Sequence, residues 1–362
     1  MNTNSLPILL VIDHFGSGGA QRQIVNIANG LIEAGEDVHV FIYYPHITHY
    51  KSFLDSKAIV HEVKKRGRYD LSGVFFIFKL LYKYNYKSAM AFLNTPAFYL
   101  EIASLFYFRK LNMVYSERTS LGLISRSLPT KLKRSLHHLC SFVTSNSIVQ
   151  TEYLKDIYGK EKVVYIPNAV PDVFFQKKNV VVKREFTVLA HTTPFKNFMY
   201  VAEALVEYKK QFKVAPPTVN WYGRKEISPE LEQTEKLLEA YDIKDSLVFH
   251  GPVSNVCEVL EASFFLIHPS KFESSANAVI EALSSSTPVL LGNLVEHREI
   301  VNQSSAGMCF DLAKPSELSK LMFEVIKLDS DAYSKLCDNA YVYSRANYRC
   351  SIVVKKYMDL LC

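Results

Sequence analysis

The sequence is poor in the features that mark several classes of protein. Its 362 residues include only six cysteines, with no Cys-x-x-Cys pair and none of the paired spacings that mark zinc sites. We therefore expect reduced cysteines in a reducing compartment. Residues 1–5 contain no basic side chain, and the apolar run at 6–12 is short and meets Asp13, which argues against a signal peptide. These absences predict a cytoplasmic protein.

Long hydrophobic runs are also scarce. Only residues 89–108 approach the length and apolar character of a transmembrane helix. This stretch is interrupted by Asn94-Thr95-Pro96 and contains Glu101. The interruption favours a buried strand, a turn and then a helix, so we expect no membrane-spanning segment.

The residues that are present indicate a globular chain with two domains. Hydrophobic residues make up 48% of the sequence and charged residues 22%, and chains longer than about 250 residues usually split into domains. The net charge of +6 is unevenly spread, because residues 1–175 hold 20 Lys and Arg against 13 Asp and Glu, and residues 176–362 hold 22 against 23. The basic N-terminal half predicts an acidic partner: nucleic acid, an anionic membrane surface or a phosphorylated acceptor.

Short apolar runs alternate with longer helical patterns along the whole chain, which is typical of parallel sheets with crossover helices. Strands are predicted at 7–13, 37–44, 89–93, 112–116, 142–145 and 163–166, and again at 186–190, 218–222, 247–250, 264–268 and 287–291; helices include 20–34, 198–211, 230–241 and 255–261. We predict two doubly wound α/β domains joined by a linker near 167–184. Ligands of such sheets bind at the carboxyl ends of the strands, which favours a site in a cleft between the domains.

Two short motifs follow predicted strands. Gly16-Ser17-Gly18-Gly19-Ala20 opens the first helix, where glycines and a helix N-terminus suit a phosphate-bearing ligand. It matches neither a dinucleotide fingerprint nor a Walker loop, and a simple tight turn is the alternative. Lys196 follows the first strand of the second domain, where it could meet a diphosphate or lie solvated at a helix start.

The strongest motif is a pair of carboxylates, Glu273 and Glu281, eight positions apart. Ser274 or Ser275 could cap a helix beginning near Ala276, so that the amides of residues 276–278 face a diphosphate at the positive end of the helix. Glu281 would lie on a mostly apolar helix, where it needs a partner such as vicinal ribose hydroxyls. A capping acid and a surface acid are the alternative.

The order of these features is similar to that of the GT4 family of retaining glycosyltransferases, which have the GT-B fold. The resemblance rests on Gly18-Gly19-Ala20-Gln21, Asn146-Ser147, Ile166-Pro167-Asn168-Ala169-Val170, Lys196-Asn197, Phe249-His250-Gly251, Pro269-Ser270 and the E-x7-E pair Glu273 and Glu281. It implies an α/β fold in which two doubly wound Rossmann-like domains face a central cleft. The expected domains are an acceptor-binding domain at 1–170, a nucleotide-sugar-binding domain at 171–345 and a C-terminal helix at 346–362 that packs back on the first domain.

The resemblance also implies roles for individual residues. These are Glu273 and Lys196 as catalytic residues, Glu281, Lys196, His191, Arg224, Val253, Ser275, Ala276, Asn277 and Ala278 in donor binding, and Gly18, Gly19 and Arg118 in the phosphate or acceptor loop. Three positions depart from the family pattern. His191 stands where many members have arginine, Ser274 where glycine is usual, and Arg118 where a histidine is frequent.

The function that this resemblance implies is retaining transfer of a hexose or N-acetylhexosamine. The donor would be a nucleotide diphosphate sugar, with a UDP-sugar favoured, and the acceptor a saccharide, in particular a lipid-linked one, in cell-surface polysaccharide or lipopolysaccharide synthesis. Asp329-Ser330-Asp331 resembles a metal motif but precedes a C-terminal helix, so we expect helix capping, no essential metal and no cofactor. A sugar-nucleotide epimerase of the same fold and a non-catalytic binding subunit remain alternatives.

Basic and aromatic segments cluster in the N-terminal half, at 64–69, 79–87 and 125–139. In the last segment leucines recur at helical spacing opposite the charges. Such a helix could lie on an anionic membrane at the inner face of the cell membrane, or be a surface helix with its apolar side in the core. No nucleic-acid-binding module is matched, so we predict no nucleic-acid partner.

Overall fold

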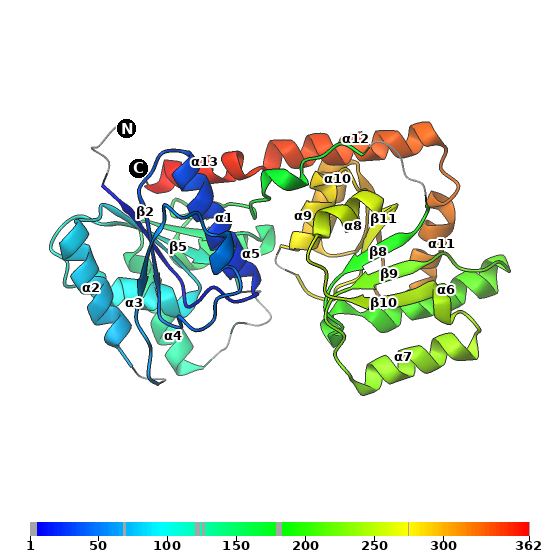
Figure 1. Cartoon of the computed structure of the whole chain (residues 1–362), viewed down its shortest axis with the longest axis horizontal. Helices are drawn as coiled ribbons and strands as arrows, with labels where there is room; N and C mark the ends of the chain where they lie inside the picture. The colour runs from blue at the N-terminus through cyan, green and yellow to red at the C-terminus, as the bar shows by residue number, and fades with distance from the viewer. Residues whose placement is uncertain are drawn as a thin grey trace. The chain divides into compact units, whose positions relative to one another are not determined.

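The computed structural model describes residues 6–361 except 68–69, 120–123, 125–126, 179–182 and 274. The chain divides into two compact units: unit 1 is Met1–Ala169 with Arg349–Cys362, and unit 2 is Val170–Tyr348. Each unit contains one parallel sheet with helices packed on both faces (Figure 1). The predicted α/β class, with two doubly wound sheets, is confirmed.

The sheet of unit 1 has seven parallel strands in the order β3-β2-β1-β4-β5-β6-β7. The strands are β1 (Ile8–Val11), β2 (Val38–Ile42), β3 (Ile59–Glu62), β4 (Ser88–Phe92), β5 (Asn112–Glu117), β6 (Phe142–Ser145) and β7 (Val163–Tyr165). β1, β2 and β4 are buried along their full length because helices cover both faces of the sheet.

The helices of unit 1 form two cores, one on each face of the sheet. They are α1 (Gly19–Glu33), α2 (Ser72–Tyr84), α3 (Asn94–Ser104), α4 (Leu128–Ser135), α5 (Ile148–Tyr158) and α13 (Cys350–Leu361), with the 3₁₀ turns η1 (Lys51–Phe53) and η3 (Leu136–Leu139). Buried side chains of α2, α3 and α5 pack on one face, and those of α1 and α13 on the other. Residues 89–108 form strand β4, a turn and helix α3, as predicted. Within the described residues, no helix is long and apolar enough to cross a membrane.

The C-terminal helix α13 lies directly against α1. A Cβ atom at Gly30 would approach Cγ2 of Val354 to 2.5 Å and Sγ of Cys350 to 2.9 Å, so the absence of a side chain lets the two helices meet closely. The end of α13 is fixed to the sheet, because Nδ2 of Asn112 donates to the carbonyl oxygen of Leu360 at 2.6 Å. Residues 349–361 are therefore part of unit 1 although they follow all of unit 2 in sequence.

Unit 2 repeats this design with six parallel strands in the order β10-β9-β8-β11-β12-β13. The strands are β8 (Phe186–Leu189), β9 (Val219–Tyr222), β10 (Leu247–Gly251), β11 (Phe265–His268), β12 (Val289–Gly292) and β13 (Gly307–Phe310). The helices are α6 (Phe198–Phe212), α7 (Pro229–Ala240), α8 (Val256–Ala262), α9 (Asn277–Ser284), α10 (Val295–Ser304), α11 (Pro315–Val325) and α12 (Ser330–Asn347), with the 3₁₀ turns η4 (Asp172–Phe174), η5 (Pro194–Lys196) and η6 (Lys244–Ser246).

The strand order of unit 2 reverses at one point. β8 lies between β9 and β11. The segments that follow β8 and β11 therefore start next to each other, at the carboxyl ends of two neighbouring strands. Such switch points are where ligands bind in doubly wound sheets. In this unit the two segments that leave it are η5, which contains Lys196, and the loop at 269–276, which contains Glu273.

Candidate active site

The switch point of unit 2 brings together the two residues predicted to be catalytic. Nζ of Lys196, in η5, donates to Oε1 of Glu273 in the loop after β11. The two segments are also joined through the backbone, because the amide of Lys271 donates to the carbonyl oxygen of Phe195 at 2.9 Å. A cation and a carboxylate that are 77 positions apart in sequence are thus held together at the mouth of the sheet.

His268, the last residue of β11, supplies a second partner for the same carboxylate. Its Nε2 atom lies 3.2 Å from Oε1 of Glu273. Burial lowers the pKa of His268, so the imidazole is neutral and Nε2 carries the proton that it donates. Burial alone would raise the pKa of Glu273, but the interactions with His268 and with Lys196 outweigh it and lower that pKa to about 2. Glu273 is therefore ionised at neutral pH.

A second histidine lies behind the first. Nδ1 of His297, in the first turn of α10, is 2.7 Å from the carbonyl oxygen of Gly292 and must donate to it. The rings of His268 and His297 meet edge to face at 5.3 Å, and burial lowers the pKa of His297 to about 4. The remaining ring nitrogens, Nδ1 of His268 and Nε2 of His297, are buried and have no hydrogen-bond partner among the residues that the structure describes. Two neutral imidazoles thus lie behind the carboxylate of Glu273, His268 in contact with it and His297 in contact with His268. Neither histidine was predicted to belong to the site.

Helix α9 presents its N-terminus at the same edge of the sheet. It begins at Asn277, and its N-cap residue is Ala276, whose side chain makes no capping hydrogen bond. Ser275 therefore stands one position before the N-cap residue instead of occupying it, and Ser274, the other predicted cap, lies outside the described residues. The backbone at Ala276 is extended, and the first-turn amides of a helix have no intrahelical acceptor. These amides form the positive end of the helix dipole.

Glu281 lies within α9 and is almost completely buried. Its neighbours Val279, Ile280, Ala282 and Leu283 belong to the apolar core on this face of the sheet. A carboxylate in such surroundings requires a polar partner. The E-x7-E spacing thus places one carboxylate in the loop before α9 and the other inside the helix.

Comparison with known proteins identifies the family. Residues 17–173 match the family described as Glycosyltransferase Family 4, and residues 171–343 match the family described as Glycosyl transferases group 1. The chain is a family 4 glycosyltransferase. No curated protein matches its sequence.

Solved structures show the same GT-B fold. A glycosyltransferase from Rickettsia africae matches with a TM-score of 0.80 and 16% identity, covering 99% of this chain and 98% of that one. HepE from Anabaena, in complex with UDP and glucose, matches with a TM-score of 0.80 and 15% identity over 99% of both chains. WaaG, a glycosyltransferase involved in lipopolysaccharide biosynthesis, matches with a TM-score of 0.69 and 14% identity over 98% of this chain and 99% of that one.

The other predicted donor residues of this glycosyltransferase lie after β8, β9 and β10. His191 follows β8, and its Nδ1 accepts a hydrogen bond from the amide of Arg224 at 3.0 Å. The guanidinium of Arg224 is exposed and pairs with Glu226 at 2.9 Å. Val253 is half-buried in the loop after β10. Arg224 and His191 are thus joined to each other, but the charge of Arg224 is directed to Glu226.

The predicted phosphate loop of unit 1 opens α1. Gly18 is the N-cap residue and Gly19 the first helical residue. The φ angle of Gly18 is −80°, which other residues can adopt, but a Cβ atom there would lie 2.1 Å from Oε1 of the buried Gln21, whose amide donates to Asp13. The backbone conformation does not require glycine at 18, but its packing against Gln21 does favour the absence of a side chain.

Arg118 is held within unit 1 by several partners. Its guanidinium donates to Oγ of Ser116 at 2.9 Å, to the hydroxyl of Tyr357 at 2.5 Å and to Oδ1 of Asn168. It also lies over the ring of Phe92, 4.6 Å from the centroid. The predicted acceptor residue thus connects β5, α13 and the Pro-Asn segment of the family motif.

The segment predicted as an amphipathic helix forms α4 and η3, with residues 125 and 126 outside the described residues. Leu128 and Leu132 are 79% and 65% exposed. Two of the basic side chains turn inward, since Lys133 donates to Oγ1 of Thr95 at 3.0 Å and Arg134 pairs with the buried Glu117, whereas Lys131 stays exposed beside the leucines. The alternative in which these leucines pack into the core is therefore wrong.

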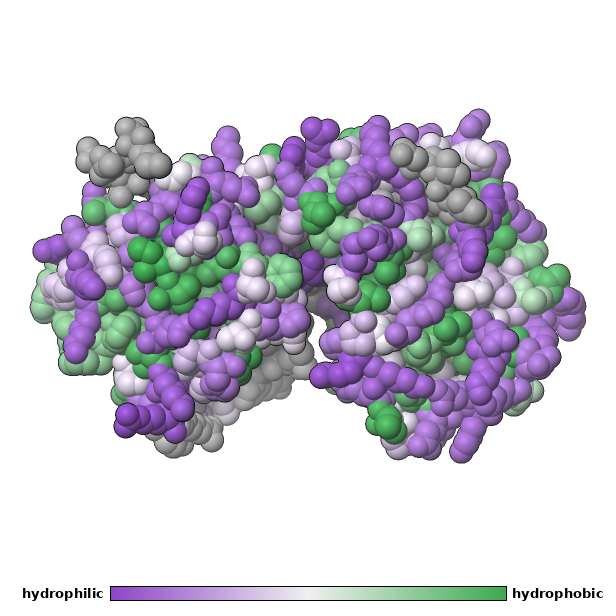
Figure 2. Space-filling view, viewed as in Figure 1, coloured by the Kyte–Doolittle hydropathy of each residue, from purple (hydrophilic) through white to green (hydrophobic). Residues whose placement is uncertain are grey.

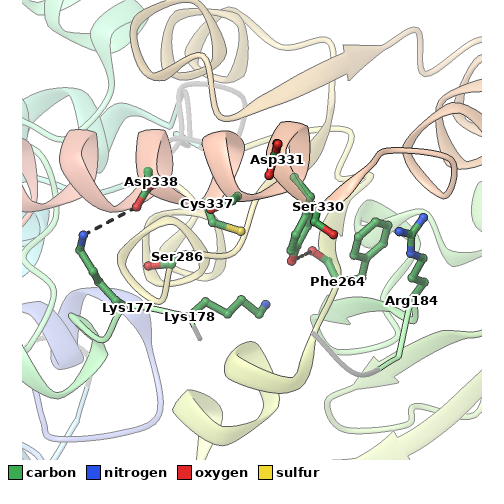
Figure 3. Close-up of a pocket in the computed structure, with 11 residues that line it drawn as sticks. Lys177, Lys178, Arg184, Phe264, Ser286, Ser330, Asp331, Cys337 and Asp338 are labelled. Carbon is green, nitrogen blue, oxygen red and sulfur yellow. Dashed lines mark hydrogen bonds and ion pairs between the residues drawn. The ribbon is translucent and has the colours of Figure 1, made fainter. Parts of the chain in front are cut away.

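A cavity of about 470 Å³ in unit 2 contains none of the predicted site residues (Figure 3). Three basic side chains line it and already have partners: Lys177 pairs with Asp338, while Lys178 and Arg184 donate to carbonyl oxygens of nearby segments. Nζ of Lys178 donates to Leu260 at 3.2 Å and also contacts Thr287 at 3.1 Å, and burial lowers its pKa to about 8. Asp329 precedes this cavity and caps α12 by accepting from the amide of Ala332 at 2.8 Å, the capping role predicted for it.

Proposed function

We propose that the protein transfers a hexose or N-acetylhexosamine from a UDP-sugar to a saccharide acceptor with retention of configuration. The acceptor is a lipid-linked saccharide used in cell-surface polysaccharide or lipopolysaccharide synthesis, at the inner face of the cell membrane. The observation that carries the proposal is the cluster of Lys196, Glu273 and His268 beside the N-terminus of α9. UDP and glucose in HepE and the lipopolysaccharide role of WaaG support the choice of donor and acceptor class.

The donor diphosphate is assigned to Lys196 and to the amides that open α9, at 276–278. Both are positive groups fixed before the reaction, so they stabilise the charge that develops on the leaving diphosphate without reorganisation. Glu281 accepts hydrogen bonds from the ribose hydroxyls, and the backbone near Val253 contacts the base. His191, Arg224, Ser275 and Asn277 complete the donor site, and Gly18, Gly19 and Arg118 meet donor or acceptor phosphate.

The low pKa of Glu273, about 2, limits what this residue can do. An ionised carboxylate has no proton to give, so Glu273 is not a general acid. It instead accepts hydrogen bonds from the transferred sugar and stabilises positive charge at the anomeric carbon. Because Lys196 and His268 already hold Glu273, we disfavour a covalent intermediate on it.

The proposed reaction is a same-face substitution. The bond from the anomeric carbon to the diphosphate oxygen breaks, and the acceptor oxygen forms its bond on the same face. The departing diphosphate oxygen takes the proton of the acceptor hydroxyl, which balances the step without a protein base. We propose no metal cofactor, since Lys196 and the helix amides are assigned to the diphosphate charge; unchanged turnover in EDTA is the expected result.

The acceptor side is assigned to unit 1, with a peripheral membrane contact through residues 125–139. The exposed Leu128 and Leu132 on α4 support that contact, because they offer apolar side chains beside basic ones. Arg126 belongs to the proposed contact and lies outside the described residues.

The test is a panel of UDP- and GDP-sugars incubated with the purified protein, with and without short lipid-diphosphate saccharides. Nucleotide release and product mass are followed together. Release from one donor only when acceptor is present is the expected result, and a retained anomeric configuration in the product is expected by NMR. Conversion of a donor without acceptor would favour an epimerase, and donor binding that no acceptor turns into release would favour a non-catalytic subunit.

A further inference from the structure

We propose that unit 1 docks on an anionic lipid bilayer through a second surface, made by the outer side of α2 and by the segment 105–110 that follows α3. We call this the α2 surface. It is separate from the contact at 125–139, and it deepens the proposed function by adding a membrane surface to the domain that receives the acceptor. The lipid binding can be measured without donor or acceptor.

The α2 surface exposes large apolar side chains that a core would normally cover. On α2, Phe75 is 62% exposed, and Leu71 and Tyr82 are also exposed. After α3, Phe108 is 90% exposed, and Leu105 and Phe106 are exposed beside it. Hydrophobic colour is visible over α2 at the left edge of the view in Figure 2. Exposed apolar surface that is contiguous marks an interaction site more often than scattered single residues do.

The aromatic side chains form a connected row. Ring centroids of Phe75 and Phe78 are 6.3 Å apart, those of Phe78 and Tyr82 are 5.1 Å apart, and those of Tyr82 and Tyr107 are 5.1 Å apart. The hydroxyl of Tyr82 also donates to the carbonyl oxygen of Phe106 at 3.1 Å. These contacts fix the segment after α3 against α2, so the exposed Phe108 projects from a fixed backbone.

The charged side chains on α2 and on the segment 105–110 are all basic, and the nearest acid before them in sequence is Asp70, next to Leu71. Residues 71–116 contain the bases Lys79, Lys83, Lys87, Arg109 and Lys110 and a single acid, Glu101. Glu101 is completely buried and pairs with His137 at 2.6 Å. The exposed ionised side chains between 71 and 116 are therefore all positive. Nζ of Lys79 lies 5.0 Å from the ring centroid of Phe75, so positive and aromatic groups are interleaved.

Aromatic side chains among cations suit the interface of an anionic bilayer. The rings insert at the level of the head groups, and each Lys or Arg near the surface adds an attraction that weakens with salt. A second copy of this chain fits less well, because two such surfaces would bring like charges together. Since α3 packs against both α2 and α4, the α2 surface and the proposed contact at 125–139 lie on neighbouring helices.

The experiment measures sedimentation of the full chain with phosphatidylcholine vesicles, with and without phosphatidylglycerol. The aromatic variant is F106S/F108S, and the charge variant is K79Q/K83Q. A matched control is I227S in unit 2, since Ile227 is 89% exposed and lies outside the α2 surface. We expect the wild type and I227S to bind anionic vesicles, and each double variant to bind at least tenfold more weakly.

Three outcomes would overturn the proposal. These are full binding by the aromatic variant, equal binding of the wild type to neutral and anionic vesicles, and self-association that the aromatic variant abolishes. Circular dichroism checks that the variants fold, and the charge variant provides a second arm if F106S/F108S does not. Turnover on a soluble acceptor is measured in parallel. Loss of vesicle binding with turnover kept identifies a docking defect, whereas a chain with no turnover that still binds vesicles counts against the proposed function alone.

Discussion

Nε2 of His268 and Nζ of Lys196 both contact the same oxygen, Oε1 of Glu273, the histidine at 3.2 Å. One contact comes from the end of β11 and the other from the turn after β8, so two neighbouring strands fix one carboxylate. The carboxylate therefore has a defined orientation before any substrate binds, which is what electrostatic catalysis requires.

Replacing His268 by phenylalanine is expected to lower kcat about 10- to 100-fold. It removes a hydrogen bond to a charged group, worth about 1.5–3 kcal/mol, and leaves UDP affinity close to that of the wild type. H268Q is the matched control, because its amide can still donate, and it should recover most of the activity. If both variants lose the same activity and also lose thermal stability, then His268 supports the fold of this region and does not specifically orient Glu273.

Glu273→Ala is expected to retain donor binding and lose most turnover. Loss of one preorganised electrostatic group costs about 10²–10³-fold in kcat, while the ribose and diphosphate contacts remain. Calorimetry with UDP and steady-state kinetics with the full donor give the two quantities. Turnover equal to that of the wild type would remove Glu273 from the reaction centre.

Glu281→Gln is expected to weaken UDP binding at least tenfold, since a charge-assisted hydrogen bond to ribose becomes a neutral one. The matched ligand is 2′,3′-dideoxy-UDP, which has no ribose hydroxyls to offer. Wild type and variant should bind this ligand with similar affinity. A variant that loses affinity for both ligands equally would indicate a packing defect in α9 instead.

The depressed pKa of Glu273 predicts an acid-sensitive part of the stability. The pKa is about 2 in the folded chain against 4.5 for the free group, so this stabilisation is complete above about pH 4.5 and is lost as the pH falls toward 2. The K196M variant lacks one of the partners that lower the pKa of Glu273. The difference between the free energies of unfolding of wild type and K196M should therefore shrink as the pH falls from about 4.5 toward 2. Thermal unfolding followed by fluorescence of Trp221, the one tryptophan of the chain, checks this. Above pH 5 the kcat profile should show no ionisation of Glu273.

Gly223→Ala is expected to destabilise unit 2 by more than about 2 kcal/mol. Gly223 has a φ angle of +153°, and a Cβ atom there would lie 2.0 Å from the carbonyl oxygen of Ala190. G251A is the control, because Gly251 also has a positive φ, +80°, but open space around it. Strain alone costs about 1–2 kcal/mol, so equal losses in urea denaturation would show that the contact with Ala190 relaxes.

The central strands could be predicted from the sequence because burial on both faces gives them continuous apolar runs. Strand β1 (Ile8–Val11), for example, lies within the predicted 7–13 and consists of Ile, Leu, Leu and Val, all buried. The edge strands β3 and β13 were not predicted, since they are only partly buried and their residues lack such a run. For α4 the sequence predicted the element but not its orientation. The spacing of the leucines indicated a helix, but it did not show which side of that helix faces the protein.

The site was predictable only in part. The E-x7-E spacing and Lys196 were visible because each follows a strand within a family motif. His268 was not, because a histidine at the end of a strand acquires meaning only from its neighbours Glu273 and His297, which the fold brings to it. Ser275 does not occupy the cap position because α9 begins at Asn277, one residue after the predicted start near Ala276, with an alanine as its N-cap residue.

The place of α13 in unit 1 has a consequence for biosynthesis. Residues 8–169 leave the ribosome before unit 2, yet the apolar side of α1 (Gly19–Glu33) is covered by side chains such as Val353 and Val354, which are translated about 320 residues after the end of α1. A nascent chain that has completed unit 2 still presents that side of α1 to water and to chaperones. Unit 2, which is continuous in sequence, can therefore finish folding before the domain that precedes it.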